Sequence, residues 1–241
     1  MNTSPPAPRP ARRAWLFGGL RLARADTPLR LPGGKIQALL AYLLLHPDQP
    51  HPREKLADLF WPHADPARVR RYLSDACYRL QQILGYDWLQ LEPDTIRLPA
   101  TADLWVDVWA FTHLASDPAH APTAVSLYQA DLLPELYDDW LLPIRVRLRE
   151  QAIRLLTQLG RQALHARRLD DAFTHYHRLV TLDPLNEAAH RGLMRVYTQQ
   201  QRPAAALAQF AQLEQILLDE LGVPPTAESA ALAAELRAAH A

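Results

Sequence analysis

The sequence is poor in cysteine and lacks any long apolar run. Cys77 is the only cysteine among 241 residues, which excludes an intramolecular disulfide and a cysteine-based zinc site. The apolar stretches at residues 14–20 and 36–45 are too short to cross a membrane, and no small-residue cleavage site of a signal peptide follows the first. We therefore expect a cytoplasmic protein in a reducing environment, with no membrane among its partners.

Motifs of catalysis and of nucleotide or metal binding are also missing. Neither the Gly-x-Ser-x-Gly of a nucleophile elbow nor the His-Glu-x-x-His of a zinc protease occurs. Gly33-Gly34-Lys35 lacks the upstream glycine of a phosphate-binding loop, and His175 and His177 would face different sides of a helix. These absences predict no enzymatic activity, no catalytic residue, no metal site and no cofactor.

Charge is divided unevenly along the chain although its formal total is zero. Residues 1–85 hold 13 Arg and Lys against 6 Asp and Glu, a balance of +7, whereas residues 86–241 hold 13 against 20, a balance of −7. A basic part of this size favours a polyanionic partner. Lys35 and Lys55 are the only lysines. The excess of arginine suits contacts to phosphates and base edges, but a GC-rich coding bias would produce it as well.

The first hundred residues alternate between short strands and helices. Residues 1–13, which begin with a proline-rich run, are expected to form a flexible tail. In residues 15–31, glycine, aspartate and proline interrupt short apolar runs, which predicts two or three short strands. Alternating runs at residues 88–91 and 95–98 flank a turn and predict a hairpin. Apolar runs bounded by proline and glycine predict the intervening helices, over residues 35–46, 52–60 and 66–84.

The third predicted helix, residues 66–84, carries the candidate functional face. Asp65 is its expected N-cap, and Gly85 is its expected end. Apolar residues recur along one side at three- and four-residue spacing: Val69, Leu73, Ala76, Leu80 and Ile83 or Leu84. Polar and basic residues occupy the other side and its flanks: Arg71, Ser74, Asp75, Tyr78 and Gln82, with Arg68, Arg70 and Arg79.

This arrangement is the plan of a helix-turn-helix, in which the polar face bonds base edges and the flanking guanidinium groups hold phosphates. The hairpin would add a wing, with Arg97 as its cation. An ordinary solvated helix also presents a charged face. The charge balance, the order of elements and the cap at Asp65 together favour DNA binding by a winged-helix domain over residues 14–100.

Beyond residue 100 the sequence becomes acidic and helical, and we expect a second domain over residues 101–241. Short helices are predicted over residues 104–114 and 122–129, and a long helix over residues 143–166. Four residue pairs recur 34 positions apart, the period of tetratricopeptide (TPR) helical hairpins: Leu159 and Leu193, Ala172 and Ala206, Tyr176 and Phe210, Leu179 and Leu213. The predicted fold class is therefore mainly α with a small β component, an N-terminal winged helix-turn-helix followed by a TPR-like all-α helical-repeat domain. A plain helical bundle is the alternative for the second part.

Six stretches, covering residues 14–240 almost throughout, resemble those of SARP-type transcriptional activators. In that family a winged-helix DNA-binding domain is joined to a bacterial transcriptional activator domain. The stretches are LPGGKIQALLAYLLLHP (31–47), REKLADLFWP (53–62), DPARVRRYLSDACYRLQQILG (65–85), LYQADLLPELYDDWLLP (127–143), LDPLNEAAHRGLMRVY (182–197) and LDELGVPPTAES (218–229).

The resemblance implies binding to double-stranded DNA at promoter direct repeats as side-by-side protomers, a homodimer on DNA, and recruitment of RNA polymerase. It places DNA contacts at residues that match the family pattern: Arg68, Arg70, Arg71, Tyr78 and Arg79, with Lys35 and Arg53 as backbone contacts. Two places depart from that pattern. Relatives commonly carry arginine after the Leu73 position, where this chain has Ser74 followed by Asp75, and they often carry an arginine pair where it has Gln81-Gln82.

Fewer positive charges would weaken phosphate attraction, whereas Asp75 could accept a hydrogen bond from a cytosine amino group. Two hypotheses follow. The first is a sequence-specific transcriptional activator associated with the nucleoid. The second is a protein-interaction adaptor built on the helical repeats, whose winged helix no longer binds DNA.

Overall fold

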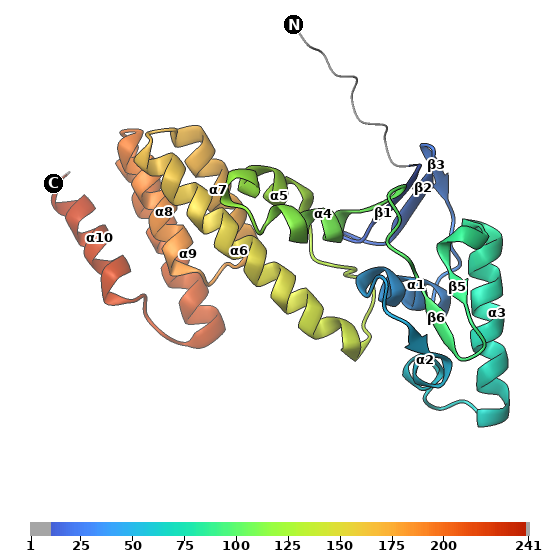
Figure 1. The fold of residues 1–241 in the computed structure, drawn as a ribbon. Coiled ribbons are helices and arrows are strands. Elements are labelled where there is room, and N and C mark those ends of the chain that lie inside the picture. The colour runs from blue at the N-terminus through green and yellow to red at the C-terminus, as the bar shows by residue number, and fades with distance from the viewer. Residues whose placement is uncertain (1–10, 240–241) are drawn as a thin grey trace, which may run out of the picture. The chain divides into compact units, whose positions relative to one another are not determined.

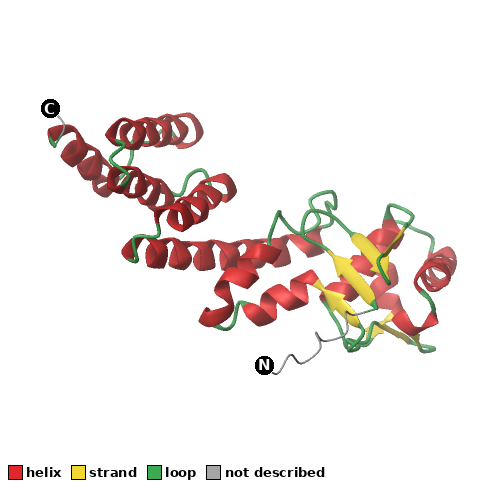
Figure 2. Ribbon diagram, turned by 90° about the horizontal axis from the view of Figure 1, so that it is seen from above, coloured by secondary structure: helices red, strands yellow, loops and turns green. Residues whose placement is uncertain are grey.

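A computed structural model describes residues 11–239, so the proline-rich residues 1–10 of the expected tail lie outside the described part. The chain divides into two compact units. The first contains the residues up to Ser116 together with Ser126–Arg145, and the second contains Asp117–Val125 together with the residues from Val146 onward. The strands of the described residues lie in the first unit, whereas the second is built of helices (Figure 2). The fold class is mainly α with a small β component, as predicted.

The first unit combines short strands with the helices that carry the candidate face (Figure 1). Its strands are β1 (Arg12–Trp15), β2 (Arg21–Arg24), β3 (Thr27–Leu29), β4 (His51–Pro52), β5 (Gln90–Leu91), β6 (Thr95–Arg97) and β7 (Leu104–Val106). Its helices are α1 (Lys35–Leu45), α2 (Arg53–Phe60), α3 (Pro66–Leu84) and α4 (Asp107–Leu114), with 3-10 turns at Tyr86–Trp88 and Asp139–Leu141.

One sheet, in the order β3-β2-β1-β7, corrects two expectations from the sequence. Strand β1 already begins at Arg12, so the predicted tail is too long. Arg12 is held there by its backbone N–H, which donates to the Asp103 carbonyl at 2.9 Å, and by its Nε, which lies 2.9 Å from Asp103 Oδ2. Residues 104–106, predicted as helix, form β7 instead, because they pair in parallel with β1. The first unit therefore continues past residue 100, where the sequence predicts a domain boundary.

Asp107 joins the start of α4 to the end of β1. Its buried carboxylate accepts hydrogen bonds from the backbone N–H groups of Leu16 at 2.9 Å, Phe17 at 3.0 Å and Val108 at 2.7 Å. Burial raises the pKa of Asp107, although these hydrogen bonds and the charge of Arg21 act in the opposite direction.

The helices α1, α2 and α3 and the hairpin form a winged helix-turn-helix, as predicted. The predicted hairpin, formed by β5 and β6, belongs to a second sheet in the order β4-β6-β5, in which β4 pairs with the free edge of β6. The three helices share an apolar core, in which Leu39, Leu43, Phe60, Leu73 and Leu80 are buried. Such a core stabilises the short elements around it because burial of apolar surface is the main favourable term in folding.

The second unit consists of stacked helical hairpins. Its helices include α7 (Leu169–Leu182), α8 (Glu187–Gln199), α9 (Pro203–Leu221) and α10 (Ala227–Ala238), while α5 (Ala121–Leu127) and α6 (Leu142–His165) contribute residues to both units. Helix α8 packs against α7 and α9, and α10 packs against α8 and α9. Both members of each of the four pairs spaced 34 residues apart are buried, so the sequence period marks the core of a TPR-like fold.

Candidate nucleic-acid interface

Helix α3 is amphipathic, and its apolar side is buried in the first unit. The helix follows Asp65, whose carbonyl accepts hydrogen bonds from the backbone N–H groups of Arg68 and Val69 at 2.8 and 3.0 Å. The buried stripe consists of Leu73, Ala76, Cys77, Leu80 and Leu84. Burial raises the pKa of the Cys77 thiol to about 11, against a smaller lowering by Arg53, so this cysteine is a protonated packing residue at neutral pH.

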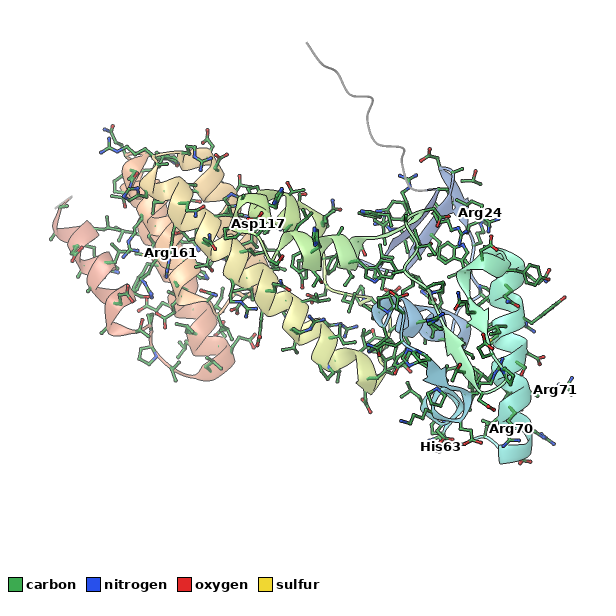
Figure 3. All side chains as sticks on the ribbon, in the orientation of Figure 1. Arg24, His63, Arg70, Arg71, Asp117 and Arg161 are labelled. Carbon is green, nitrogen blue, oxygen red and sulfur yellow. The ribbon has the colours of Figure 1, made fainter. Side chains whose placement is uncertain are left out.

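The opposite side of α3, which we call the outer face, presents the predicted residues to solvent. The Arg71 side chain is 83% exposed and projects away from the rest of its unit (Figure 3). Tyr78 is 60% exposed. At 100° per residue both lie opposite the buried stripe. Ser74, Asp75 and Gln82 are also exposed on this side.

Contacts within the outer face are local and weak. Asp75 Oδ2 lies 3.8 Å from Arg71 Nε, an exposed pair one helical turn apart. Such pairs contribute at most about 0.5 kcal/mol, so the Arg71 guanidinium is available to another anion. Gln82 Nε2 donates to the Tyr86 hydroxyl at 2.9 Å, and Ser74 Oγ donates to the carbonyl of Arg70 at 2.9 Å.

Arginines occupy both edges of the outer face. Arg68 and Arg79 are exposed on one edge, and Arg70 lies about 160° around the helix from Arg68. The Arg70 side chain is 80% exposed, and its Nη2 lies 3.3 Å from Glu54 Oε1 on α2. This surface ion pair connects the two helices of the helix-turn-helix, and sequence reasoning did not identify Glu54 because residues on different elements share no periodic pattern.

A groove of about 640 Å³ runs beside α3, between α2 and the turn of the wing. Arg53 ties α2 to that turn, because its backbone N–H donates to the Asp94 carbonyl at 2.9 Å and its Nε donates to the Glu92 carbonyl at 3.1 Å. The groove is lined by Pro52, Arg53, Glu54, Ala57, Arg70, Leu73, Ser74, Pro93 and Asp94.

The remaining predicted cations are engaged by neighbours outside the outer face. Lys35, the first residue of α1, lies with its Nζ 3.3 Å from Asp138 Oδ1. Arg97, on β6, donates from its Nε to Gln90 Oε1 on the neighbouring strand at 3.0 Å. The structure thus brings together the predicted residues of α3 and places Arg53 at the groove. Lys35 instead pairs with Asp138, and Arg97 donates to Gln90, both within the first unit.

Neither a metal centre nor a membrane-spanning helix is present among residues 11–239. This part of the chain contains no cluster of three or more His, Cys, Asp and Glu side chains that could hold a metal ion. None of its helices is both long enough and apolar enough to cross a membrane.

The comparison with known proteins identifies one family. The model of the bacterial transcriptional activator domain matches residues 106–237, more than half of the chain. The transcriptional regulatory protein MoaR1 of Mycobacterium tuberculosis is 27% identical over 230 residues, covering 87% of this chain and 74% of MoaR1. The regulatory protein AfsR of Streptomyces coelicolor is 29% identical over 232 residues, covering 89% of this chain but only 23% of AfsR.

A solved structure supports the same fold. The chain of Mycobacterium tuberculosis EmbR, determined in complex with a low-affinity phosphopeptide, matches with a TM-score of 0.72 at 20% identity, and the match covers 95% of this chain and 65% of EmbR. The likeness extends across both the winged helix and the helical unit. The chain therefore belongs to the bacterial transcriptional activator domain family and is a transcriptional regulator of the SARP type.

Proposed function

We propose that the chain regulates transcription by binding duplex DNA sequence-specifically through the outer face of α3. The observation that carries this proposal is the exposure of Arg71 and Tyr78 opposite a fully packed apolar stripe. A surface helix with this division of polarity fits the major groove of B-DNA, which is wide enough to admit an α-helix.

The residues divide into two groups by their place on the helix. The base-edge contacts would come from Arg71, Asp75, Tyr78 and Gln82, near the centre of the outer face, and from Ser74, on its groove side. Phosphates would be contacted by the arginines on the edges of the outer face, Arg68, Arg70 and Arg79. Cations outside α3 would add further phosphate contacts: Arg53 at the groove, Lys35 and Arg97. Arg70 would exchange its exposed partner Glu54 for a phosphate, at little cost because surface ion pairs are weak.

The wider role follows from the family. We infer that two protomers bind side by side on promoter direct repeats and recruit RNA polymerase, as activators of this type do, and that the chain works in the cytoplasm at the nucleoid without catalysis or a cofactor. The similarity to MoaR1 and AfsR, both named as regulators, supports this role.

The test begins by selecting binding sites from a pool of randomised duplexes with the full chain. Fluorescence anisotropy then compares a selected duplex with an unselected one, over a range of salt concentrations. Arg71→Ala should weaken binding to the selected duplex by about 5- to 150-fold, equivalent to about 1–3 kcal/mol, and affect the unselected duplex less. Arg79→Ala should weaken both duplexes alike and reduce the salt slope by about one.

Arg154→Ala is the matched control, because Arg154 is an exposed arginine of α6 paired with Glu150 at 3.8 Å. It should change neither affinity. If Arg71→Ala weakens both duplexes equally, α3 contacts phosphates only and does not read sequence.

The carboxylates on and beside the outer face favour one other candidate function. Asp75 and Glu54 each lie within ion-pair distance of an arginine of α3, which lowers the net positive charge offered to DNA. The chain would then be a protein-interaction adaptor whose winged helix no longer binds DNA. Absence of salt-dependent binding to any duplex, even at about 20 mM salt, would select this second function.

A further inference from the structure

The second unit contains a polar pocket of about 330 Å³ that the proposed DNA contacts do not use. Its lining residues come from α6, α7 and α8 and from the start of α10. Its charged and phenolic lining comes from Arg161 on α6 (labelled in Figure 3), Arg191 and Arg195 on α8, Tyr176 on α7 and Glu228 on α10. A volume of this size is at the lower end of small-molecule sites.

Tyr176 forms part of the pocket because two glycines admit its ring between α6 and α8. A Cβ atom at Gly192 would lie 2.5 Å from the ring, and one at Gly160 would lie 2.9 Å from it. The residue is 4% exposed. Burial raises the pKa of Tyr176, against a lowering by Arg161 and Arg195, so its hydroxyl is protonated at neutral pH and can donate a hydrogen bond. No hydrogen-bond partner of this hydroxyl is found among the described residues.

The arginines of the pocket differ in how their charge is balanced. Arg191 is neutralised by Glu228 at 2.8 Å, with Glu187 at 3.9 Å. Arg161 and Arg195 form no ion pair with any described carboxylate. Two unpaired guanidinium groups that both act on one phenol produce a locally positive potential, which attracts an anion.

We propose that this pocket binds an oxyanion, the carboxylate or phosphate group of a small molecule. Arg161 and Arg195 supply the charge and the planar N–H donors that fit either group, and Tyr176 supplies a neutral donor fixed in place by its ring. The site lies on the helical unit and involves none of the residues of α3. Anion binding at this pocket can therefore be tested independently of DNA binding.

The experiment measures the thermal unfolding midpoint of the full chain with inorganic phosphate, succinate or the neutral analogue succinamide, at ionic strength held constant with sodium chloride. Phosphate or succinate should raise the midpoint, because a ligand that binds only the folded state stabilises it, and succinamide should not. A rise with phosphate alone assigns the site to phosphate, and a rise with succinate alone assigns it to carboxylate.

Variants separate specific binding from general salt effects. R161Q/R195Q should abolish the rise, and Arg154→Gln, on the same helix but outside the pocket, should retain it. Arg161 and Arg195 are both exposed, so the double variant should fold, which far-UV circular dichroism checks. Tyr176→Phe should weaken the apparent affinity by about tenfold, the loss expected for one hydrogen bond to a charged group. A rise that persists in R161Q/R195Q, or no rise with either anion, overturns the proposal.

Discussion

The packing of Tyr176 predicts that Gly192→Ala destabilises the helical unit, although alanine is the better helix former. In an unobstructed helix this change would stabilise by about 1 kcal/mol. Here the new Cβ would lie 2.5, 2.5 and 2.6 Å from three atoms of a buried ring. Overpacking of a core typically costs about 1–3 kcal/mol. The cost here should lie at the upper end of this range, because α6 and α8 hold the Tyr176 ring on both sides. We expect a net loss of about 1–2 kcal/mol.

Gly160→Ala provides a graded comparison, because its Cβ would meet the same ring at 2.9, 3.0 and 3.2 Å. Its overpacking cost should be smaller and should nearly cancel the gain in helix propensity. Tyr176→Ala removes the obstruction altogether. In that background Gly192→Ala should become stabilising, by about 1 kcal/mol or more, because it also fills part of the space left by the ring.

Hydrogen exchange of the full chain, followed by mass spectrometry, reports these changes locally in α6, α7 and α8. Gly192→Ala should accelerate exchange in these helices by about 5- to 30-fold, the equivalent of about 1–2 kcal/mol. Slower exchange in Gly192→Ala with Tyr176 intact would refute the reasoning, because it would mean that propensity outweighs the contact with the ring.

Three further predictions concern buried or hydrogen-bonded groups. Asp107→Ala should cost about 3 kcal/mol or more in urea unfolding, because three backbone N–H groups lose their acceptor, and a cost under about 1 kcal/mol would contradict this role. Glu187 accepts hydrogen bonds from Thr226 and Ser229; burial acts to raise its pKa, but these bonds and the charge of Arg191 lower it overall. Its stabilising contribution is therefore complete above its unfolded pKa of 4.5 and is lost as the pH falls through the lower folded value, so Glu187→Gln should flatten the acid limb of the stability profile below about pH 4.5. Cys77, with a pKa of about 11, should not react with a thiol reagent at about pH 8 until the chain is unfolded in denaturant, and rapid labelling of the native chain would show that α3 is not packed as described.

The sequence predicted those features that a local pattern encodes. The apolar stripe of α3, the hairpin and the pairs spaced 34 residues apart each follow from the spacing of residue types along a single element or repeat. Strand β7 was missed because its pairing with β1 joins residues about 90 positions apart, and no local pattern contains that partner. The exposure of Arg71 was predicted from helical geometry, whereas its neighbour Arg70 has a partner on α2 that only the tertiary structure reveals. The DNA contacts themselves stay a prediction.

The pocket beside Tyr176 was missed for a related reason. Gly160 and Gly192 look like helix-weakening residues in the sequence, and their role becomes visible only when a third helix places a ring between them. Arg161 and Arg195 lie on different helices, so their shared surroundings are a product of the stacking of hairpins.

The pairing of β7 with β1 has a consequence for how the regulator can be dissected. The family match begins at residue 106, in the last residue of β7, and the chain enters the second unit at Asp117 before returning to the first at Ser126. A fragment cut at the family boundary would separate Asp107 from the amides of Leu16 and Phe17, and it would remove Val106, the residue of β7 that pairs with Ala14 of β1. Because the residues of the two units alternate along the chain, a cut at one peptide bond cannot release either unit intact.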